Sequence, residues 1–141
     1  MNGLPSLSTT AELLGALHSV EARLEAAIEP YDLSLAKFGL LARLASAGEP
    51  LSLRALAERC ACVKSNITQL VDRLEAEGLV TREDDPQDGR SVRAVLTRKG
   101  RERHAVSARA LEAAEQEVFR HLTPRQRDDL LGLARVLKGE S

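Results

Sequence analysis

The chain has 141 residues, a formal net charge of −1 and a calculated pI of about 6.3, so its overall charge gives no sign of a nucleic-acid partner. Tyr31, Phe38 and Phe119 are the only aromatic residues, which argues against a base-stacking platform for single strands. The hydrophobic runs are too short to span a membrane, and the first six residues lack the basic and apolar regions of an export signal. We therefore expect one cytoplasmic domain over residues 1–141, with no membrane partner.

The first predicted helix covers residues 9–30. Thr9 and Glu12 match a capping box, in which two side chains satisfy backbone N–H groups at a helix start. Apolar residues follow at alternating steps of four and three and form a narrow stripe: Leu13, Leu17, Val20, Leu24 and Ala27. Such a stripe requires a partner helix, so we expect this segment to take part in dimerisation.

A DNA-binding lobe is predicted over residues 34–97, and it begins with two helices. The first is capped by Ser34 and ends at Gly48, and it carries core residues at helical spacing: Leu35, Phe38, Leu41, Leu44 and Ala45. The second is short, running from the N-cap Ser52 to about Arg59. A tight turn then leads into a third helix.

The third helix of the lobe runs from about residue 63 to residue 77 and ends at Gly78. One face is apolar, with Ile67, Leu70, Val71 and Leu74. The opposite face is polar and consists of Lys64, Ser65, Asn66, Thr68, Gln69 and Arg73. Amides can pair with adenine edges and cations with phosphates, but a polar face is also the ordinary state of a solvated helix.

A β-hairpin is predicted after this helix, and this context favours DNA binding over an ordinary solvated helix face. We expect a strand over 79–81, a turn over 84–91 with Pro86 and Gly89 supplying the turn chemistry, and a return strand over 92–97. Asp88 can shape the turn while the guanidinium of Arg90 reaches into a minor groove. The order of elements predicts a mainly α fold with a small β-hairpin, a winged helix-turn-helix that places one helix in a major groove.

Two more helices are predicted over residues 98–139. A long helix follows Thr97, and Thr123-Pro124-Arg125-Gln126 opens the last one. Both have apolar stripes, so the N- and C-terminal helices are expected to pack together across a two-fold axis as a dimerisation region. Stripes at helical spacing equally fit a bundle within one monomer, which is the alternative.

Four segments resemble the MarR family of bacterial transcription regulators. They are KSNITQLVDRLE at 64–75, GLV at 78–80, DPQDGR at 85–90 and VLTRKG at 95–100. The lengths and order of the flanking helices extend the resemblance over nearly the whole chain. It implies a homodimer, acting as a repressor, that binds a pseudopalindromic operator in double-stranded DNA and releases it when a small, often phenolic ligand or an oxidant binds.

The resemblance also implies roles for single residues. Among them, Arg73 would contact the DNA backbone, and Asp88 would steady Arg90 at the wing tip. Gly89 and Val63 depart from the family, which often has an arginine and an N-capping serine at these places. The full set expected to bind DNA, including basic residues of the lobe, is Arg54, Lys64, Ser65, Asn66, Thr68, Gln69, Arg73, Asp88 and Arg90.

Cys60 and Cys62 are the only cysteines and allow three interpretations. Both stand where this architecture needs small or medium apolar side chains, and burial is the favoured interpretation because free cysteine is among the most buried residue types. A thiol-based redox sensor is the alternative. Two thiols cannot complete a tetrahedral zinc site and the three histidines are scattered, so no metal site and no cofactor are predicted.

Other classes of function have weaker support. The sequence contains no Gly-rich phosphate loop, nucleophile elbow or His-Glu-x-x-His motif, so no enzyme is predicted. A winged helix can also be a protein-interaction module, and the acidic hairpin favours that alternative, whereas the polar helix face suits base edges better. His18, Tyr31, Lys37 and Arg43 could contact an anionic aromatic effector, but the sequence assigns none of them.

Overall fold

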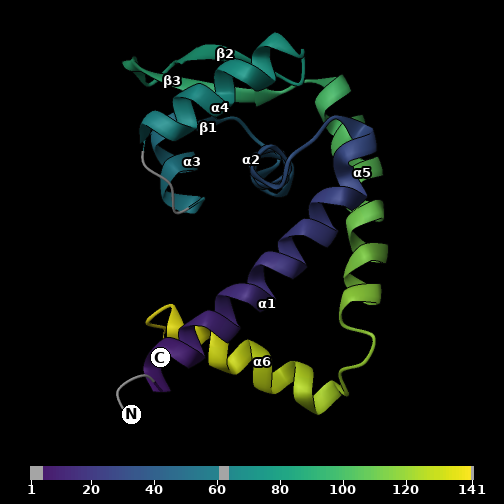
Figure 1. The fold of residues 1–141 in the computed structure, drawn as a ribbon. Coiled ribbons are helices and arrows are strands. Elements are labelled where there is room, and N and C mark those ends of the chain that lie inside the picture. Colours follow the sequence, from purple (N-terminus) through teal and green to yellow (C-terminus); the bar gives the residue numbers. More distant parts are fainter. Residues whose placement is uncertain (1–4, 61–63, 141) are drawn as a thin grey trace. The chain divides into compact units, whose positions relative to one another are not determined.

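The computed structural model describes residues 5–60 and 64–140, with side chains described for 7–60 and 66–140. Helices dominate, as the sequence predicts (Figure 1): α1 Pro5–Ile28, the 3-10 helix η1 Glu29–Tyr31, α2 Leu35–Ala47, α3 Leu53–Arg59, α4 Lys64–Ala76, α5 Arg98–Val118 and α6 Pro124–Leu137. The strands are β1 Leu51–Ser52, β2 Val80–Asp85 and β3 Asp88–Leu96. No helix in the described part of the chain is long and apolar enough to cross a membrane.

The chain divides into two compact units. The terminal unit comprises the residues up to Leu24 and those from Glu112 onward, and the central unit comprises Glu25–Leu111. The central unit contains the whole helix-turn-helix and hairpin. The lobe predicted over residues 34–97 lies inside it, and the end of α1 and the first part of α5 extend it on either side.

Short polar side chains start the helices where the sequence predicts. The hydroxyl of Ser34 accepts a hydrogen bond from the Lys37 N–H at 3.1 Å, and that of Ser52 accepts one from the Ala55 N–H at 3.0 Å. Thr123 and Gln126 form a complete capping box at the start of α6. These bonds satisfy backbone donors that a helix start leaves unpaired.

Left-handed glycines end α2 and α4, also as predicted. Gly48 has φ 66° and Gly78 has φ 77°. After α4 the N–H of Leu79 donates to the carbonyl of Leu74 at 2.9 Å, and that of Gly78 donates to Glu75 at 2.9 Å. This pair of bonds is a Schellman motif, and it turns the chain from α4 into β2.

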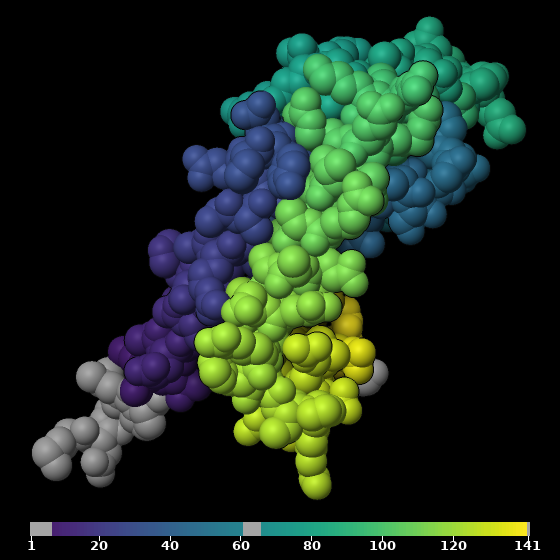
Figure 2. Space-filling view, turned by 90° about the vertical axis from the view of Figure 1, so that its right-hand side faces the viewer, coloured from purple at the N-terminus to yellow at the C-terminus, as the bar shows by residue number. Residues whose placement is uncertain are grey.

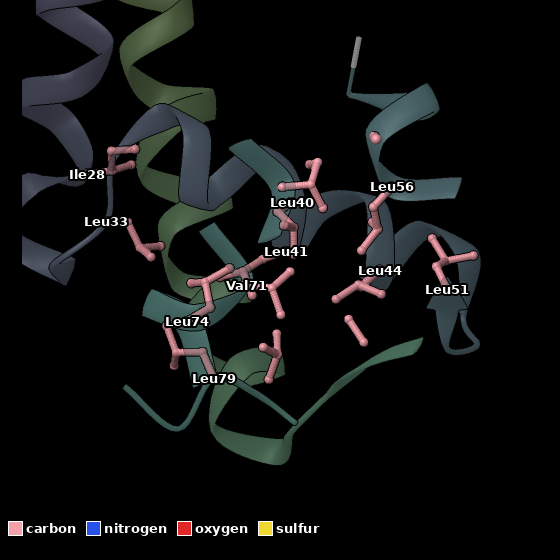
Figure 3. Packing of buried hydrophobic residues seen from close by; sticks show 14 residues of the cluster. Ile28, Leu33, Leu40, Leu41, Leu44, Leu51, Leu56, Val71, Leu74 and Leu79 are labelled. Atoms are coloured by element: carbon pink, nitrogen blue, oxygen red, sulfur yellow. The ribbon is translucent and has the colours of Figure 1, made fainter. Parts of the chain in front are cut away.

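The core of the central unit lies between α2, α3, α4 and the sheet (Figure 3). Its fully buried members include Leu40 and Leu41 of α2 and Ile67, Val71 and Leu74 of α4. Each such side chain contributes roughly 1.5–3 kcal/mol by leaving water. The apolar face predicted for α4 is therefore confirmed, with Leu70 at its partly buried edge.

The sheet differs from the predicted hairpin in two respects. β1, which the sequence did not predict, pairs with β3 (Leu51 opposite Ala94), so the sheet has three antiparallel strands in the order β1-β3-β2. The predicted turn over 84–91 was too long, because the strands continue until Asp85 faces Asp88. Gly89 therefore lies in β3 without a positive φ, and its predicted turn role was wrong.

The first helix also differs from its prediction. In the described part of the chain α1 extends from Pro5, four residues before Thr9. Thr9 therefore lies inside the helix, and the predicted capping box of Thr9 with Glu12 at a helix start was wrong. At the other end α1 stops at Ile28, and the next three residues, which include Pro30, form η1.

Gly100 fixes how α5 begins against the end of α4. The Thr97 hydroxyl donates to the carbonyl oxygen of Gly78 at 2.7 Å and accepts from the Gly100 N–H at 2.9 Å. A Cβ atom on Gly100 would overlap the carbonyl oxygen of Leu79 and lie 2.8 Å from Cδ1 of Leu96. No alanine can fit there unless α5 moves away from Leu79.

We predict that Gly100→Ala lowers the free energy of unfolding by about 1–3 kcal/mol, because an overpacked backbone contact outweighs the better helix propensity of alanine. Gly89→Ala is the matched control, since nothing lies within 4 Å of the added Cβ. The control should be neutral or slightly stabilising. Urea denaturation of both variants at one protein concentration measures the difference, and equal stability of the two would contradict the packing argument.

Candidate nucleic-acid interface

α4 presents a polar face on the side opposite its buried residues. Asn66, Gln69 and Arg73 are exposed, while Ile67, Val71 and Leu74 are buried. Spacings of three and four residues place the exposed three along one side of the helix, which we call the reading face. Together with Ala36, Ile67 and Leu70 they line a shallow surface hollow.

The other residues of α4 that were predicted to bind DNA are either half-buried or have side chains outside the described residues. Thr68 is half-buried, whereas Asn66, Gln69 and Arg73 are exposed. The backbone of Lys64 and Ser65 forms the first turn of α4, but their side chains lie outside the described residues. Val63 lies outside them altogether, so the missing N-cap predicted there stays a prediction.

The tip of the hairpin is held by its own acidic side chains. Asp85 accepts a hydrogen bond from the Gln87 N–H at 2.9 Å, and Asp88 accepts one from the Arg90 N–H at 3.1 Å. Asp88 thus fixes the backbone at Arg90 and leaves the guanidinium exposed. This is the geometry that the sequence suggested, in which an acid shapes the wing and the arginine points outward.

Arg54 and Arg90 lie at one hollow. Arg54, in the first turn of α3, and Arg90, on the wing, line it together with Leu53, Asp88, Ser91 and Val92. Arg54 also forms a highly exposed ion pair with Glu58 at 3.6 Å, a geometry that contributes little stability. The hollow at the wing and the hollow at the reading face share no lining residue.

Internal ion pairs occupy several other cations of the central unit. Arg82 pairs with Asp72 and Glu75, Arg93 with Glu83, and Arg98 with Glu102. In residues 5–60 and 64–140, no ion pair involves Arg73 or Arg90. Among the described residues of the central unit, Arg43 and Arg59 are likewise exposed and outside any ion pair.

Sequence reasoning missed the role of Arg82 within this surface. From the sequence, this residue was assigned no role. The available signal was Asp72 and Glu75, three residues apart and therefore on one side of α4, followed by a single arginine on the next strand. Which strand residue would face them depended on how the hairpin docks, and the sequence does not specify that.

The cysteines and the effector candidates receive little support as a site. Cys60 is half-buried and packs against the core, while Cys62 lies outside the described residues, so burial of both cysteines stays a prediction. Lys37 forms an ion pair with Glu77 at 2.9 Å, and Arg43 lines a small hollow with Cys60. Among the described residues no group of three or more His, Cys, Asp or Glu side chains could hold a metal ion.

His104 packs against α2. Its ring stacks on Phe38 with 5.2 Å between the ring centres. Burial lowers the pKa of His104, because a charged imidazole loses solvation there. The backbone carbonyl of Tyr31, another effector candidate, accepts a hydrogen bond from the Arg103 guanidinium at 3.0 Å.

A helix-turn-helix whose second helix exposes a polar face, followed by a β-hairpin with an arginine near its tip, defines a winged helix-turn-helix protein. A family model described as MarR family matches residues 31–91. An uncharacterized HTH-type transcriptional regulator of Bacillus subtilis, YkoM, is 35% identical over 118 residues, which cover 82% of this chain and 71% of the relative. The chain therefore belongs to the MarR family of transcription regulators, whose members are not enzymes.

Solved structures of the family have the same fold. A MarR-like regulator from Bacillus cereus is 28% identical with a TM-score of 0.85, covering 97% of this chain and 98% of that one. Sco3205 of Streptomyces coelicolor, solved in complex with DNA, is 28% identical with a TM-score of 0.86, covering 94% and 84%. BpsR of Bordetella bronchiseptica, whose DNA binding is regulated by 6-hydroxynicotinic acid, is 26% identical with a TM-score of 0.86, covering 94% of each chain.

Proposed function

We propose that this chain is a homodimeric repressor that binds a pseudopalindromic operator in double-stranded DNA and releases it when a small aromatic ligand binds. The observation that carries the proposal is the reading face of α4. Asn66, Gln69 and Arg73 are exposed while the residues behind them are fully buried, so the helix offers amides and a cation outward on a rigid support. The DNA complex of the relative from Streptomyces coelicolor supports the same use of the fold.

In this proposal each subunit makes three kinds of DNA contact. Asn66 and Gln69 pair with base edges in the major groove, with Ser65 and Thr68 assisting, while Arg73, Arg54 and Lys64 neutralise phosphates. Arg90, held by Asp88 through its backbone, enters the neighbouring minor groove. Two copies of α4, roughly 34 Å apart, then meet successive major grooves.

The dimer part of the proposal is supported by the terminal unit. α6 has no buried residue, yet it carries large apolar side chains, and Figure 2 shows this yellow segment open on the surface of the face it draws. Among the residues whose side chains are described, the exposed large hydrophobic ones all belong to the terminal unit: Leu7, Leu13, Leu14, Leu17, Leu130, Leu131, Leu133, Val136 and Leu137. A patch of this kind typically marks an interface, and a second copy of the chain is the proposed cover.

The ligand part rests on the family and on the relative from Bordetella bronchiseptica, which responds to 6-hydroxynicotinic acid. A ligand would act by preferring a dimer in which the two α4 helices have the wrong separation for B-form DNA. None of the four effector candidates is assigned to a site.

Selection of bound sequences from random duplexes tests the proposed function. We expect an inverted repeat whose half-sites are centred about 10 base pairs apart or a multiple of one turn. Recovery of unrelated sequences, or of a repeat that is not inverted, would contradict a dimer with two equivalent reading faces. It would leave the protein-interaction module as the better hypothesis.

Arg90→Ala tests the wing. We expect about a tenfold loss of affinity, equal to about 1.4 kcal/mol, at operators with A/T-rich flanks and a smaller loss at G/C-rich flanks. The control is Arg125→Ala, which removes an exposed arginine of α6 in the terminal unit. Gel-shift titrations on both flank types measure the effect, and an equal loss at all flanks would remove the proposed minor-groove role.

Leu133→Ser tests the dimer. Leu133 is 63% exposed on α6, and burial of such a side chain contributes roughly 1.5 kcal/mol. Because a two-fold axis uses each residue twice, we expect the dissociation constant of the dimer to rise about 100-fold. Arg135→Ser, two residues away, should change it little. Sedimentation at several concentrations compares the variants, and a monomeric wild-type chain at micromolar concentration would overturn the dimer.

A further inference from the structure

Arg82 connects the wing to α4 through four hydrogen bonds. Its guanidinium donates to Asp72, to Glu75 at 2.8 Å and to the backbone carbonyl of Thr68 at 3.4 Å. Its own backbone N–H donates to the second carboxylate oxygen of Glu75 at 3.2 Å. One residue of β2 is therefore bonded to three successive turns of the helix that carries the reading face.

The positive charge of Arg82 interacts with Asp72 and Glu75 of α4. The side chain is only 25% exposed. Burial opposes its charge, but the hydrogen bonds and charges of Asp72 and Glu75 outweigh burial, so the pKa of Arg82 is raised. A guanidinium already shared between two carboxylates has few donors left for a DNA phosphate.

Asp72 and Glu75 would otherwise harm a DNA-binding surface. Both are exposed, and Asp72 is adjacent to Arg73 and three residues beyond Gln69 on the same helix. Two carboxylates and one arginine have a net charge of −1, whereas the carboxylates alone have −2. Repulsion of the phosphate backbone would rise in the part of α4 where Arg73 is needed.

We infer that Arg82 is a positioning residue for DNA binding: it fixes α4 against the wing and offsets one of the two negative charges of Asp72 and Glu75, without contacting DNA itself. The inference rests on the proposed DNA-binding function. A positioning role also accounts for the hydrogen bond from Arg82 to the Thr68 carbonyl, because that carbonyl lies within the turns that carry Asn66 and Gln69. Movement of the wing would then change the orientation of the reading face directly.

Arg93 is a matched control in the same hairpin. Its side chain is also 25% exposed and pairs with one carboxylate, that of Glu83. Glu83 and Arg93 face each other on β2 and β3, so this ion pair joins two strands that are already hydrogen-bonded. It makes no bond to α4 among the described residues. Loss of Arg93 removes the same charge and a similar amount of packing without freeing the helix.

The first experiment needs no DNA. Hydrogen exchange is measured on Arg82→Met and Arg93→Met at equal protein concentration. We expect faster exchange of the amides of residues 68–76 in the first variant and not in the second, because only Arg82 is bonded to α4. Unchanged exchange of these amides in Arg82→Met would overturn the positioning role even if no operator were known.

The second experiment is a thermodynamic cycle on the selected operator. We expect Arg82→Met to weaken binding about tenfold and Arg93→Met to change it less than about threefold. In the background of Asp72→Asn with Glu75→Gln, Arg82→Met should weaken binding less than about threefold, because the carboxylates through which Arg82 acts are absent.

Additive effects would overturn the inference. If Arg82 contacted a phosphate, Arg82→Met would weaken binding equally with and without Asp72 and Glu75. If Arg82→Met fails to fold, Arg82→Lys keeps the charge but not the forked donors and enters the same cycle. Failure of the wild-type chain to bind any selected duplex would instead contradict the proposed function, and the exchange comparison would still test Arg82.

Discussion

Complete burial of one side of α4 is the constraint on which the surface of the central unit depends. Ile67, Val71 and Leu74 are inaccessible, and rotating the helix by one residue would carry polar Thr68 or Asp72 toward the core. Roughly 1.5–3 kcal/mol for each buried side chain far exceeds the ~1 kcal/mol that an N-cap contributes. The outward direction of Asn66 and Gln69 therefore follows from the core.

Charge on this surface is controlled by pairing more than by composition. The chain is nearly neutral, and the wing contains several acids, yet Glu83, Asp85 and Asp88 all bind groups of the hairpin itself. Arginines that face these acids or those of α4 lose much of their attraction for an external anion. Among the described residues of the central unit, the exposed arginines that form no ion pair include Arg73 and Arg90. A chain with this arrangement would need specific contacts for tight binding, since a general positive field is missing.

The features predicted from the sequence are those that short stretches of chain determine. Ser34, Ser52, Thr123, Gly48 and Gly78 act on bonds within a few residues, and each lies at the helix end where it was expected. β1 was missed because two residues carry no pattern and their partners lie about 40 positions later. The length of the wing turn and the contacts of Arg82 depend on how the hairpin docks, and only the folded central unit specifies that.

The terminal unit poses a different physical problem, because its helices have little to pack against within one chain. Of the described side chains of α1 only that of Ile28 is buried, and α6 has none that is buried. A helix of 14 residues is only marginally stable by itself, even with the capping box that Thr123 and Gln126 provide. In the proposed dimer, association would supply the missing burial. Folding of α6 would then be coupled to dimer formation, and a change in how the chains associate would also change the separation between the two reading faces.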